Sequence, residues 1–363
     1  MDNEFTNAYA LCSHYFHRGK YDEARGSALL LLNSLHPLHL NLAGWVLYRS
    51  GDPVNSKAAF CKSQLFSAVN SEAVFGLAVL AMDAGDAVQA FHFFSDLRKR
   101  NRLRSAWLFS FCALTVDIAE PMESLQIMEE YCSLRPSVSP YEISILQILR
   151  AVVSNSNSID LPTNLLPVEL LHSIELFFQH PHALLFGCRG TGLRTAVEQI
   201  KLSDELNLEF GTWRGASALV LAKALHGKDL HCFDSLHGLA EDWGEFKAGS
   251  YCSNGIPPCL PCNTILHVGR FEHTLADFLI TRRENVAFIH IDCDTYESTS
   301  YVLNLISPRI RSGTVILFDE FFMHDTWETS EYLAFMEWTF KNALCYKIIA
   351  LSPFTRQAIL IMQ

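Results

Sequence analysis

A helical repeat in the first half of the chain limits its fold more than any other sequence feature. Turns that contain glycine recur at Gly19, Gly51 and Gly85, at spacings of 32 and 34 residues. Across residues 5–150, apolar side chains follow the 3.6-residue period of an amphipathic helix, and strand-like alternation is almost absent. A repeat of this length predicts stacked helix pairs, because one pair cannot bury its apolar face alone.

These units resemble tetratricopeptide repeats. The first unit places small residues where two helices approach and larger residues between them, and Pro37 closes it. Two similar units and a degenerate fourth follow, and a helix from about Pro140 to Val153 would cap the last one. The resemblance implies a surface that binds a protein partner, or a lobe for dimerisation or substrate docking. We therefore expect a helical repeat domain over residues 1–153.

A polar segment follows this array. Ser154 to Pro162 is short and rich in turn-forming residues, which is typical of a boundary between two cores. We expect a linker over 154–165 and a second domain over 166–363, because a chain of 363 residues is longer than one hydrophobic core usually supports. The polar linker also predicts that the second domain folds on its own.

The second half alternates short β-rich runs with helical stretches, which predicts a parallel sheet with helices on both faces. The expected strands are Leu206–Phe210, Leu230–Phe233, Thr264–Val268, Val286–Ile291, Thr314–Phe318, Tyr346–Leu351 and Ala358–Met362. Only six residues separate the last two runs, too few for a crossover helix, so these should pair antiparallel. The expected fold class is α plus α/β: an all-α repeat array followed by a Rossmann-like, seven-stranded class I methyltransferase domain.

Glycines after the first of these strands predict a nucleotide-type cofactor. Gly211 and Gly215 let the backbone approach a ligand at a helix N-terminus, where free N–H groups are available. Asp234 ends the next strand, about 20 residues further on, where an acid can accept both ribose hydroxyls. The spacing also fits NAD. S-adenosylmethionine is favoured because the pattern is Glu-x-Gly-x-x-x-Gly and because the acids that follow have no role in hydride transfer.

Four acids after the fourth and fifth expected strands give the sharpest chemical signal: Asp292, Asp294, Asp319 and Glu320. Adjacent parallel strands present the residues at their carboxyl ends to one crevice. Carboxylates crowded there repel one another unless a cation lies between them, and oxygen ligands suit Mg²⁺ or Mn²⁺. In the alternative interpretation, Asp294 or Ser298 is the N-cap of a helix that begins near Thr299.

From about Leu208 to Trp338 the chain resembles the macrocin O-methyltransferase family of metal-dependent sugar methylases. Five blocks match in order: Glu-Phe-Gly-x-x-x-Gly-x-Ser, Phe-Asp-Ser-x-x-Gly-Leu-x-Glu-Asp-Trp, Gly-x-Phe-x-x-Thr-Leu, His-Ile-Asp-Cys-Asp-x-Tyr-x-Ser-Thr and Phe-Asp-Glu-x-Phe. The resemblance implies a metal site of Asp292, Asp319 and Glu320, with Asp294 as general base. The cofactor-binding candidates on the matching blocks are Glu209, Gly211, Thr212, Gly215, Ser217, Asp234, Ser235, Gly269, Phe271 and Asp292. Phe321 and the segment His324–Glu328 depart from the family pattern.

Together these features predict an O-methyltransferase that uses S-adenosylmethionine and Mg²⁺ or Mn²⁺. The acceptor would be a hydroxyl of a vicinal diol, which by the resemblance is a sugar residue of a glycan, glycolipid or natural product. The alternative is an interaction or scaffold protein whose sheet domain binds the cofactor without turnover, and the intact acid set argues against it. The repeat array leaves open both a protein partner and a homo-oligomer.

Composition excludes several other classes. With 28 basic and 39 acidic residues the net charge is −11, so nucleic acid is not an expected partner. No apolar run reaches the roughly 18 residues of a membrane span, which predicts a cytoplasmic protein. Eleven cysteines, an odd number scattered through helical and strand-like patterns, predict reduced thiols.

Three local motifs have alternative interpretations. The segment from Gly187 to Thr195 is similar to a phosphate-binding loop but has Leu193 at the position where such a loop needs lysine. Its alternative interpretation is that it lines the entrance of the cofactor site. His290 is either a core histidine or a second-layer residue behind the acids. A zinc set of Cys252, Cys259, Cys262 and His267 lacks a second Cys-x-x-Cys and is interpreted as loop thiols.

Overall fold

The computed structural model describes residues 2–67, 70–156, 166–203 and 205–363. The chain divides into two compact units, Met1–Phe111 and Cys112–Gln363. Most of the expected linker at 154–165 lies outside the described residues, so that boundary stays a prediction. The division between the compact units falls within the helical part, close to the start of the fourth predicted repeat.

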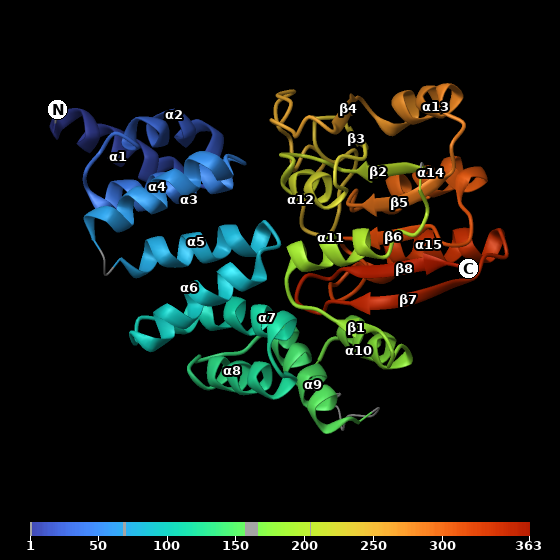
Figure 1. Cartoon of the computed structure of the whole chain (residues 1–363), viewed down its shortest axis with the longest axis horizontal. Helices are drawn as coiled ribbons and strands as arrows, with labels where there is room; N and C mark the ends of the chain where they lie inside the picture. The colour runs from blue at the N-terminus through green and yellow to red at the C-terminus, as the bar shows by residue number, and fades with distance from the viewer. Residues whose placement is uncertain (1, 68–69, 157–165, 204) are drawn as a thin grey trace. The chain divides into compact units, whose positions relative to one another are not determined.

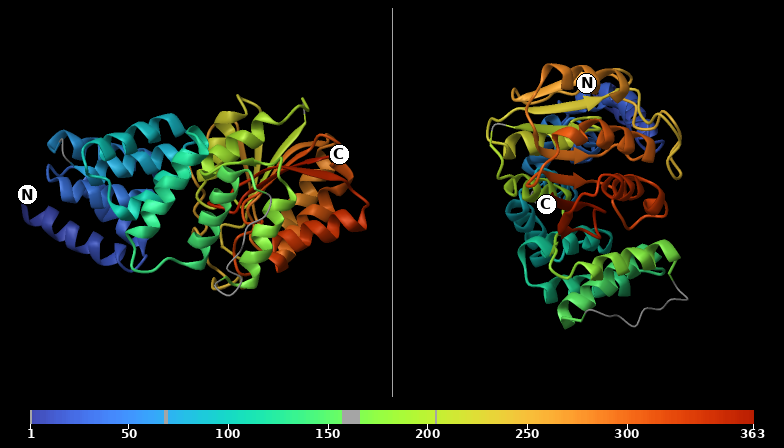
Figure 2. Two further views of the ribbon diagram at one scale, coloured as in Figure 1. Left: turned by 90° about the horizontal axis from the view of Figure 1, so that it is seen from below. Right: turned by 90° about the vertical axis from the view of Figure 1, so that its right-hand side faces the viewer.

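The first unit is an array of paired helices, coloured blue to cyan in Figures 1 and 2: α1 (Asp2–Phe16), α2 (Tyr21–Leu31), α3 (Pro37–Arg49), α4 (Pro53–Phe66), α5 (Ser71–Asp83) and α6 (Ala87–Lys99). The three predicted turn glycines follow α1, α3 and α5 with φ of +69°, +75° and +71°. Glycine adopts this left-handed region without the steric cost of a side chain, so it ends each first helix of a pair. The helical repeat predicted from the sequence is confirmed.

Glycine also allows close packing inside this array. The Phe60 ring of α4 lies against Gly44 of α3 and Gly76 of α5, where an added Cβ would approach ring atoms to 2.6 and 2.4 Å. Phe60 is completely buried. Small residues facing one large ring therefore bring three helices together.

Four further helices belong wholly or largely to the second unit: α7 (Leu108–Ile118), preceded by the short 3₁₀ helix η1 (Ser105–Trp107), then α8 (Pro121–Ser133), α9 (Pro140–Ser154) and α10 (Val168–Gln179). A capping box begins α9, in which Ser139 and Glu142 each bond the other's backbone N–H. The helix predicted over Pro140 to Val153 is confirmed to within a residue.

The sheet of the second unit has the strand order β1-β7-β8-β6-β5-β2-β3-β4. Its strands are β1 (Leu184–Leu185), β2 (Leu206–Phe210), β3 (Leu230–Asp234), β4 (Thr264–Val268), β5 (Val286–Ile291), β6 (Val315–Phe318), β7 (Tyr346–Leu351) and β8 (Ala358–Met362). The predicted β7–β8 hairpin is antiparallel, and β8 also pairs antiparallel with β6. The sheet has eight strands instead of the seven expected, because the two-residue β1 adds to the edge beside β7.

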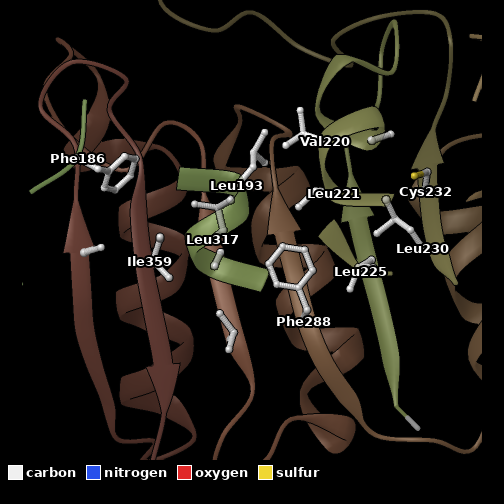
Figure 3. Packing of buried hydrophobic residues seen from close by; sticks show 14 residues of the cluster. Phe186, Leu193, Val220, Leu221, Leu225, Leu230, Cys232, Phe288, Leu317 and Ile359 are labelled. Atoms are coloured by element: carbon white, nitrogen blue, oxygen red, sulfur yellow. The ribbon is translucent and has the colours of Figure 1, made fainter. Parts of the chain in front are cut away.

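Helices cover both faces of this sheet. In Figure 3, α11 (Arg189–Glu198) and α12 (Ala216–Ala224) lie in front of the strands, and Leu193 and Leu221 point from them toward Phe288. The other helices of this unit are α13 (Phe271–Thr281), α14 (Tyr296–Ile306), α15 (Glu331–Lys341) and the 3₁₀ helices η2 (Ser307–Arg309) and η3 (Trp327–Thr329). Within the described residues, no helix is both long and apolar enough to cross a membrane. All eleven cysteines are free thiols.

Candidate active site

Two of the predicted acids meet where neighbouring strands end. Asp292 directly follows β5, and Asp319 directly follows the adjacent parallel strand β6. Their backbone N–H groups continue the sheet, with Asp292 bonded to Phe210 and Asp319 to Ile291, each at 2.9 Å. The sheet thus delivers both carboxylates to one place. Their side chains are 22% and 10% exposed.

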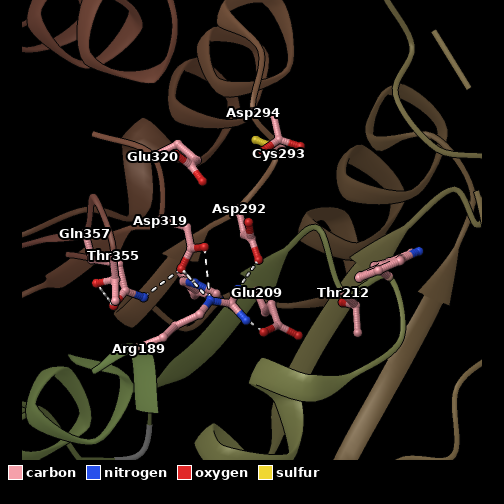
Figure 4. Close-up of polar contacts among 12 residues, drawn as sticks. Arg189, Glu209, Thr212, Asp292, Cys293, Asp294, Asp319, Glu320, Thr355 and Gln357 are labelled. Atoms are coloured by element: carbon pink, nitrogen blue, oxygen red, sulfur yellow. Dashed lines mark hydrogen bonds and ion pairs between the residues drawn. The ribbon is translucent and has the colours of Figure 1, made fainter. Parts of the chain in front are cut away.

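A guanidinium lies between these two carboxylates (Figure 4). Arg189, the first residue of α11, donates from Nη2 to Asp292 at 2.6 Å and from Nε to both oxygens of Asp319 at 3.1 Å. Gln357 also donates to Asp319, at 2.6 Å. Sequence reasoning missed Arg189 and Gln357 because nothing in their local pattern indicates partners more than 30 residues away.

Behind Asp319 a fully buried histidine links two acids. His290 of β5 contacts Glu209 through Nδ1 at 3.1 Å and Asp319 through Nε2 at 3.4 Å. Burial lowers the pKa of His290, but its bonds to Asp319 and Glu209 raise that pKa to about 10. The imidazole therefore holds a proton at neutral pH and donates from both nitrogens. Among the interpretations left open for His290, the geometry favours the second layer behind the acids.

The pKa values of Asp292 and Asp319 are shifted in opposite directions. Burial acts to raise the pKa of Asp319, but the Arg189 guanidinium and His290 hold that pKa well below its usual range. Burial raises the pKa of Asp292, and the charge on Asp319 raises it further. Arg189 and His290 thus favour the charged form of Asp319, whereas burial and the charge on Asp319 disfavour the charged form of Asp292.

Asp294 and Glu320 lie on the side of Asp292 and Asp319 that is opposite Arg189 in Figure 4. Burial raises the pKa of Asp294 to about 7, and the charges of Glu320 and Asp319 act in the same direction. Burial also raises the pKa of Glu320 to about 8, against the opposing effect of Arg356, which donates to it at 3.2 Å. Both acids therefore titrate near neutrality, the range in which a carboxylate serves as a general base.

The backbone of Asp294 is held in the left-handed region, with φ of +63°. Glu331, the first residue of α15, accepts from the backbone N–H groups of Asp294 at 3.1 Å, Cys293 at 3.3 Å and Glu320 at 3.3 Å. One completely buried carboxylate thus ties both acidic segments together. The N-cap of α14 is Thr295, so Asp294 does not have the capping role considered as its alternative. Glu331 was not predicted, because in the sequence it is only the first residue of an ordinary helix.

The glycine loop after β2 packs directly on the acid segment. Gly211 has φ of +89°, and a Cβ there would lie 1.7 Å from the carbonyl oxygen of Asp292. Gly215 caps α12, and no side chain caps this helix N-terminus. Asp234 at the end of β3 accepts from the backbone N–H groups of Thr212 at 2.8 Å and Trp213 at 2.6 Å. Asp234 therefore orders the loop in which three of the cofactor-binding candidates lie.

The remaining cofactor-binding candidates lie at different depths. Glu209 is completely buried, where it bonds His290 and accepts from Cys232 at 3.1 Å, so its partners are core side chains. Ser217 is also buried and bonds Glu209. Ser235 accepts from the backbone N–H of His237. Gly269, with φ of +143°, precedes α13, whose first residue Phe271 packs edge-to-face on Phe210 at 5.5 Å.

Two cavities border this cluster. The first has a volume of about 420 Å³, and its lining includes Tyr141, Trp243, Phe246, His324, Asp325 and Arg356. The second, of about 450 Å³, is lined in part by Trp243 and by Thr295, which follows Asp294. The rings of Trp243 and Phe246 stack at 5.5 Å. The buried indole N–H of Trp243 has no hydrogen-bond partner among the described residues, so it is a donor available to a ligand.

Two helices support the arginines of the site. Asp117 of α7 accepts from the backbone N–H groups of Gly187 at 2.7 Å and Cys188 at 3.1 Å, directly before Arg189. Tyr141 of α9 contacts the carbonyl oxygens of Pro353 at 2.7 Å and Phe354 at 2.9 Å, shortly before Arg356. The segment that resembles a phosphate-binding loop thus supplies Arg189 to the acid cluster.

Among the residues that the structure describes, one group of three potential ligands has its ligand atoms within 4.8 Å of one another: His290, Asp292 and Asp319. Glu320, the third predicted metal ligand, is not part of that group and instead pairs with Arg356. The cysteines considered for zinc do not form such a group either.

Comparison with known proteins identifies the sheet unit. Residues 208–321 match a family model described as a methyltransferase domain. No curated protein matches the chain. The sheet unit therefore contains a methyltransferase domain.

Solved structures similar to the chain include two methyltransferases and a repeat protein. The calicheamicin methyltransferase CalS11 is 19% identical, with a TM-score of 0.40 over 62% of this chain and 94% of its own. The O-methyltransferase NovP is 19% identical, with a TM-score of 0.36 over 50% and 82%. A tetratricopeptide repeat protein from Parabacteroides merdae is 14% identical, with a TM-score of 0.42 over 61% and 86%.

Proposed function

We propose that this protein transfers a methyl group from S-adenosylmethionine to a hydroxyl of a vicinal diol, with Asp294 as the general base. The observation that carries the proposal is the placement of Asp294, a carboxylate whose backbone Glu331 holds in place and which directly precedes a residue that lines a cavity. A carboxylate at the edge of the acceptor cavity can accept the hydroxyl proton.

The glycine loop and Asp234 would hold the cofactor. When bound, S-adenosylmethionine supplies an electrophilic methyl group on a sulfonium. The uncapped N-terminus of α12 offers free backbone N–H groups, and Gly211 leaves no side chain between the loop and Asp292. Asp234 has both oxygens engaged with backbone N–H groups: Oδ2 accepts two of them, and Oδ1 accepts one and retains a lone pair for a ribose hydroxyl. These features fit the cofactor class predicted from the sequence.

The two cavities would bind the acceptor. The stacked rings of Trp243 and Phe246 offer a flat apolar face, and the free indole N–H, His324 and Arg356 offer polar contacts around it. A sugar ring presents both a flat face of C–H groups and a rim of hydroxyls, so this lining supports a sugar acceptor. The array α1–α6 would then serve to bind a partner or the carrier of the sugar.

The acid pair does not fit the divalent ion expected from the sequence. The ligand atoms are close enough to share an ion, but Arg189 already bonds both carboxylates, and both ring nitrogens of His290 are engaged with Glu209 and Asp319. Mg²⁺ and Mn²⁺ favour oxygen ligands whose lone pairs are available. The proposed reaction therefore contains no metal-dependent step, and proton removal rests on Asp294.

Replacing Asp294 with Asn tests the base directly. We expect kcat to fall by about 10²–10⁴-fold, because the amide keeps the size of the side chain but cannot accept the proton. Turnover is measured by mass spectrometry on a panel of glycosides with free vicinal diols, alongside counterparts in which one hydroxyl is already methylated.

Asp277→Asn on the exposed surface of α13 is the matched control, and it should leave kcat unchanged. Calorimetry should show that both variants still bind S-adenosylmethionine. If Asp294→Asn kept full turnover, Asp294 would not be the general base. If free and blocked diols were turned over equally, the acceptor would not be a vicinal diol.

A further inference from the structure

Arg189 forms hydrogen bonds with both carboxylates of the acid pair. Its Nη2 and Nε atoms donate to two separate carboxylates, at 2.6 Å to Asp292 and at 3.1 Å to both oxygens of Asp319. An arginine that donates to carboxylates in this way combines charge with directional hydrogen bonds. The guanidinium therefore supplies the positive charge that two neighbouring carboxylates require.

The Oδ1 atom of Asp319 has no lone pair left for another ligand, whereas Oδ2 accepts from Arg189 alone. A carboxylate offers about four acceptor positions on its two oxygens. Arg189 uses one on each oxygen, and Gln357 at 2.6 Å and His290 at 3.4 Å reach the first oxygen. A cation that bound Oδ1 would have to displace one of these donors, and a cation that bound Oδ2 would lie beside the positively charged Arg189.

The position of Arg189 is built into the fold. Asp117 fixes the two peptide N–H groups just before it, and it also accepts from the Thr191 hydroxyl at 2.8 Å. Gly187 packs so closely on α7 that a Cβ would lie 1.7 Å from the carbonyl oxygen of Ala113. This segment cannot move away from the site without breaking those contacts, so the guanidinium is preorganised between the carboxylates.

We propose that Arg189 is the resident cation of the Asp292–Asp319 pair and that it keeps divalent metal out of this site. Arg189 is a positioning residue: it holds the ends of β5 and β6 together and so fixes the chain that leads from Asp292 to the proposed base. This inference concerns the same site as the proposed function, but its test needs no turnover, so the two can fail separately.

Mn²⁺ binding to the full-length chain tests the proposal by electron paramagnetic resonance. The parent protein should show no saturable Mn²⁺ site below about 1 mM. Arg189→Met removes the charge and keeps most of the length, and it should bind one Mn²⁺ on the order of tenfold or more tightly. Adding Asp319→Asn to this variant should abolish the gain, which places the ion at the acid pair.

Two controls accompany these variants. Arg194→Met removes an equal charge from the exposed side of the same helix and should bind no more Mn²⁺ than the parent. Arg189→Lys keeps a cation at the site and should likewise show no gain. If Arg189→Met folds poorly, its Tm should rise on adding Mn²⁺, whereas the Tm of the parent should not change.

Three results would overturn the proposal. The first is a saturable, micromolar Mn²⁺ site in the parent that Asp319→Asn removes. The second is an Arg189→Met variant that folds and gains no Mn²⁺ site. The third is an Arg189→Met variant that loses S-adenosylmethionine binding without gaining metal, which would assign the guanidinium to the cofactor carboxylate.

Discussion

Helices α1–α6 and helices α7–α9 continue one repeat pattern, but their polar side chains bond to different kinds of partner. In the first group, Trp45 donates to Glu72 and Tyr48 to Asp83, both on a neighbouring helix of the array. In the second group, Asp117 and Tyr141 bond backbone groups 70 and 212 residues further along, in loops of the methyltransferase unit. Helices with one sequence pattern thus serve as a repeat array in one case and as part of a catalytic unit in the other.

The largest expected effect comes from cutting the chain on either side of α7–α9. A protein that begins at Ser105 keeps both supporting residues and should unfold in one cooperative transition. A protein that begins at Leu166, the boundary expected from the sequence, loses them, and its Tm should fall by roughly 10 °C or more, if it is soluble at all. Scanning calorimetry of the two truncated proteins gives the comparison. Equal stability and equal cofactor binding would show that α7–α9 are dispensable.

A second effect compares one substitution in the two regions. In Gly187→Ala the new Cβ would overlap the backbone carbonyl of Ala113, which cannot rotate away, so we expect a loss of about 3 kcal/mol and reduced turnover. In Gly76→Ala the Cβ meets only the Phe60 ring, which can shift, and alanine also favours the helix. A loss of about 1–2 kcal/mol with unchanged kcat is expected there.

Denaturant unfolding and steady-state kinetics measure both glycine variants. The contrast fails if Gly76→Ala lowers kcat as much as Gly187→Ala does, because the array would then influence the site as strongly as α7.

The smallest effect concerns two aspartates that each accept from a helix N-terminus. Asp117→Asn should cost about 1–3 kcal/mol, because an amide N–H₂ would face the donors of Cys188 and Thr191. Asp52→Asn, at the N-terminus of α4, should cost about 1 kcal/mol or less, since its partner Arg25 is half exposed.

Their pH dependence should have opposite signs. Burial acts to raise the pKa of Asp52, but bonds from Asn55 and Arg25 lower it, so its stabilising contribution is lost as pH falls through the folded pKa. Burial raises the pKa of Asp117 despite its bonds to Gly187. Protonation of this carboxylate at low pH therefore stabilises the folded state relative to the unfolded state. Between about pH 6 and about pH 3, the free energy of unfolding should fall less steeply in Asp52→Asn than in the parent protein. In Asp117→Asn it should fall more steeply than in the parent. Parallel curves for the two variants would contradict this assignment.

The sequence predicted the strands and helices well because hydrophobic periodicity reports which face of an element is buried. It also predicted that Asp292 and Asp319 would meet, since parallel strands bring their ends to one edge. It could not reveal Arg189 or Glu331, because each joins the site only through contacts between residues distant in the sequence. The role of α7–α9 was missed for the same reason: a repeat pattern does not record where an outward-facing aspartate or tyrosine finds its partner.

The position of β8 has a consequence for the nascent chain. This strand follows all others in sequence, yet it lies between β7 and β6 in the sheet. While a ribosome is still adding these residues, the sheet remains split, and the edges of β6 and β7 offer unpaired backbone groups to other chains. A stalled or prematurely terminated product that lacks Ala358–Met362 should therefore aggregate instead of accumulating as a folded intermediate.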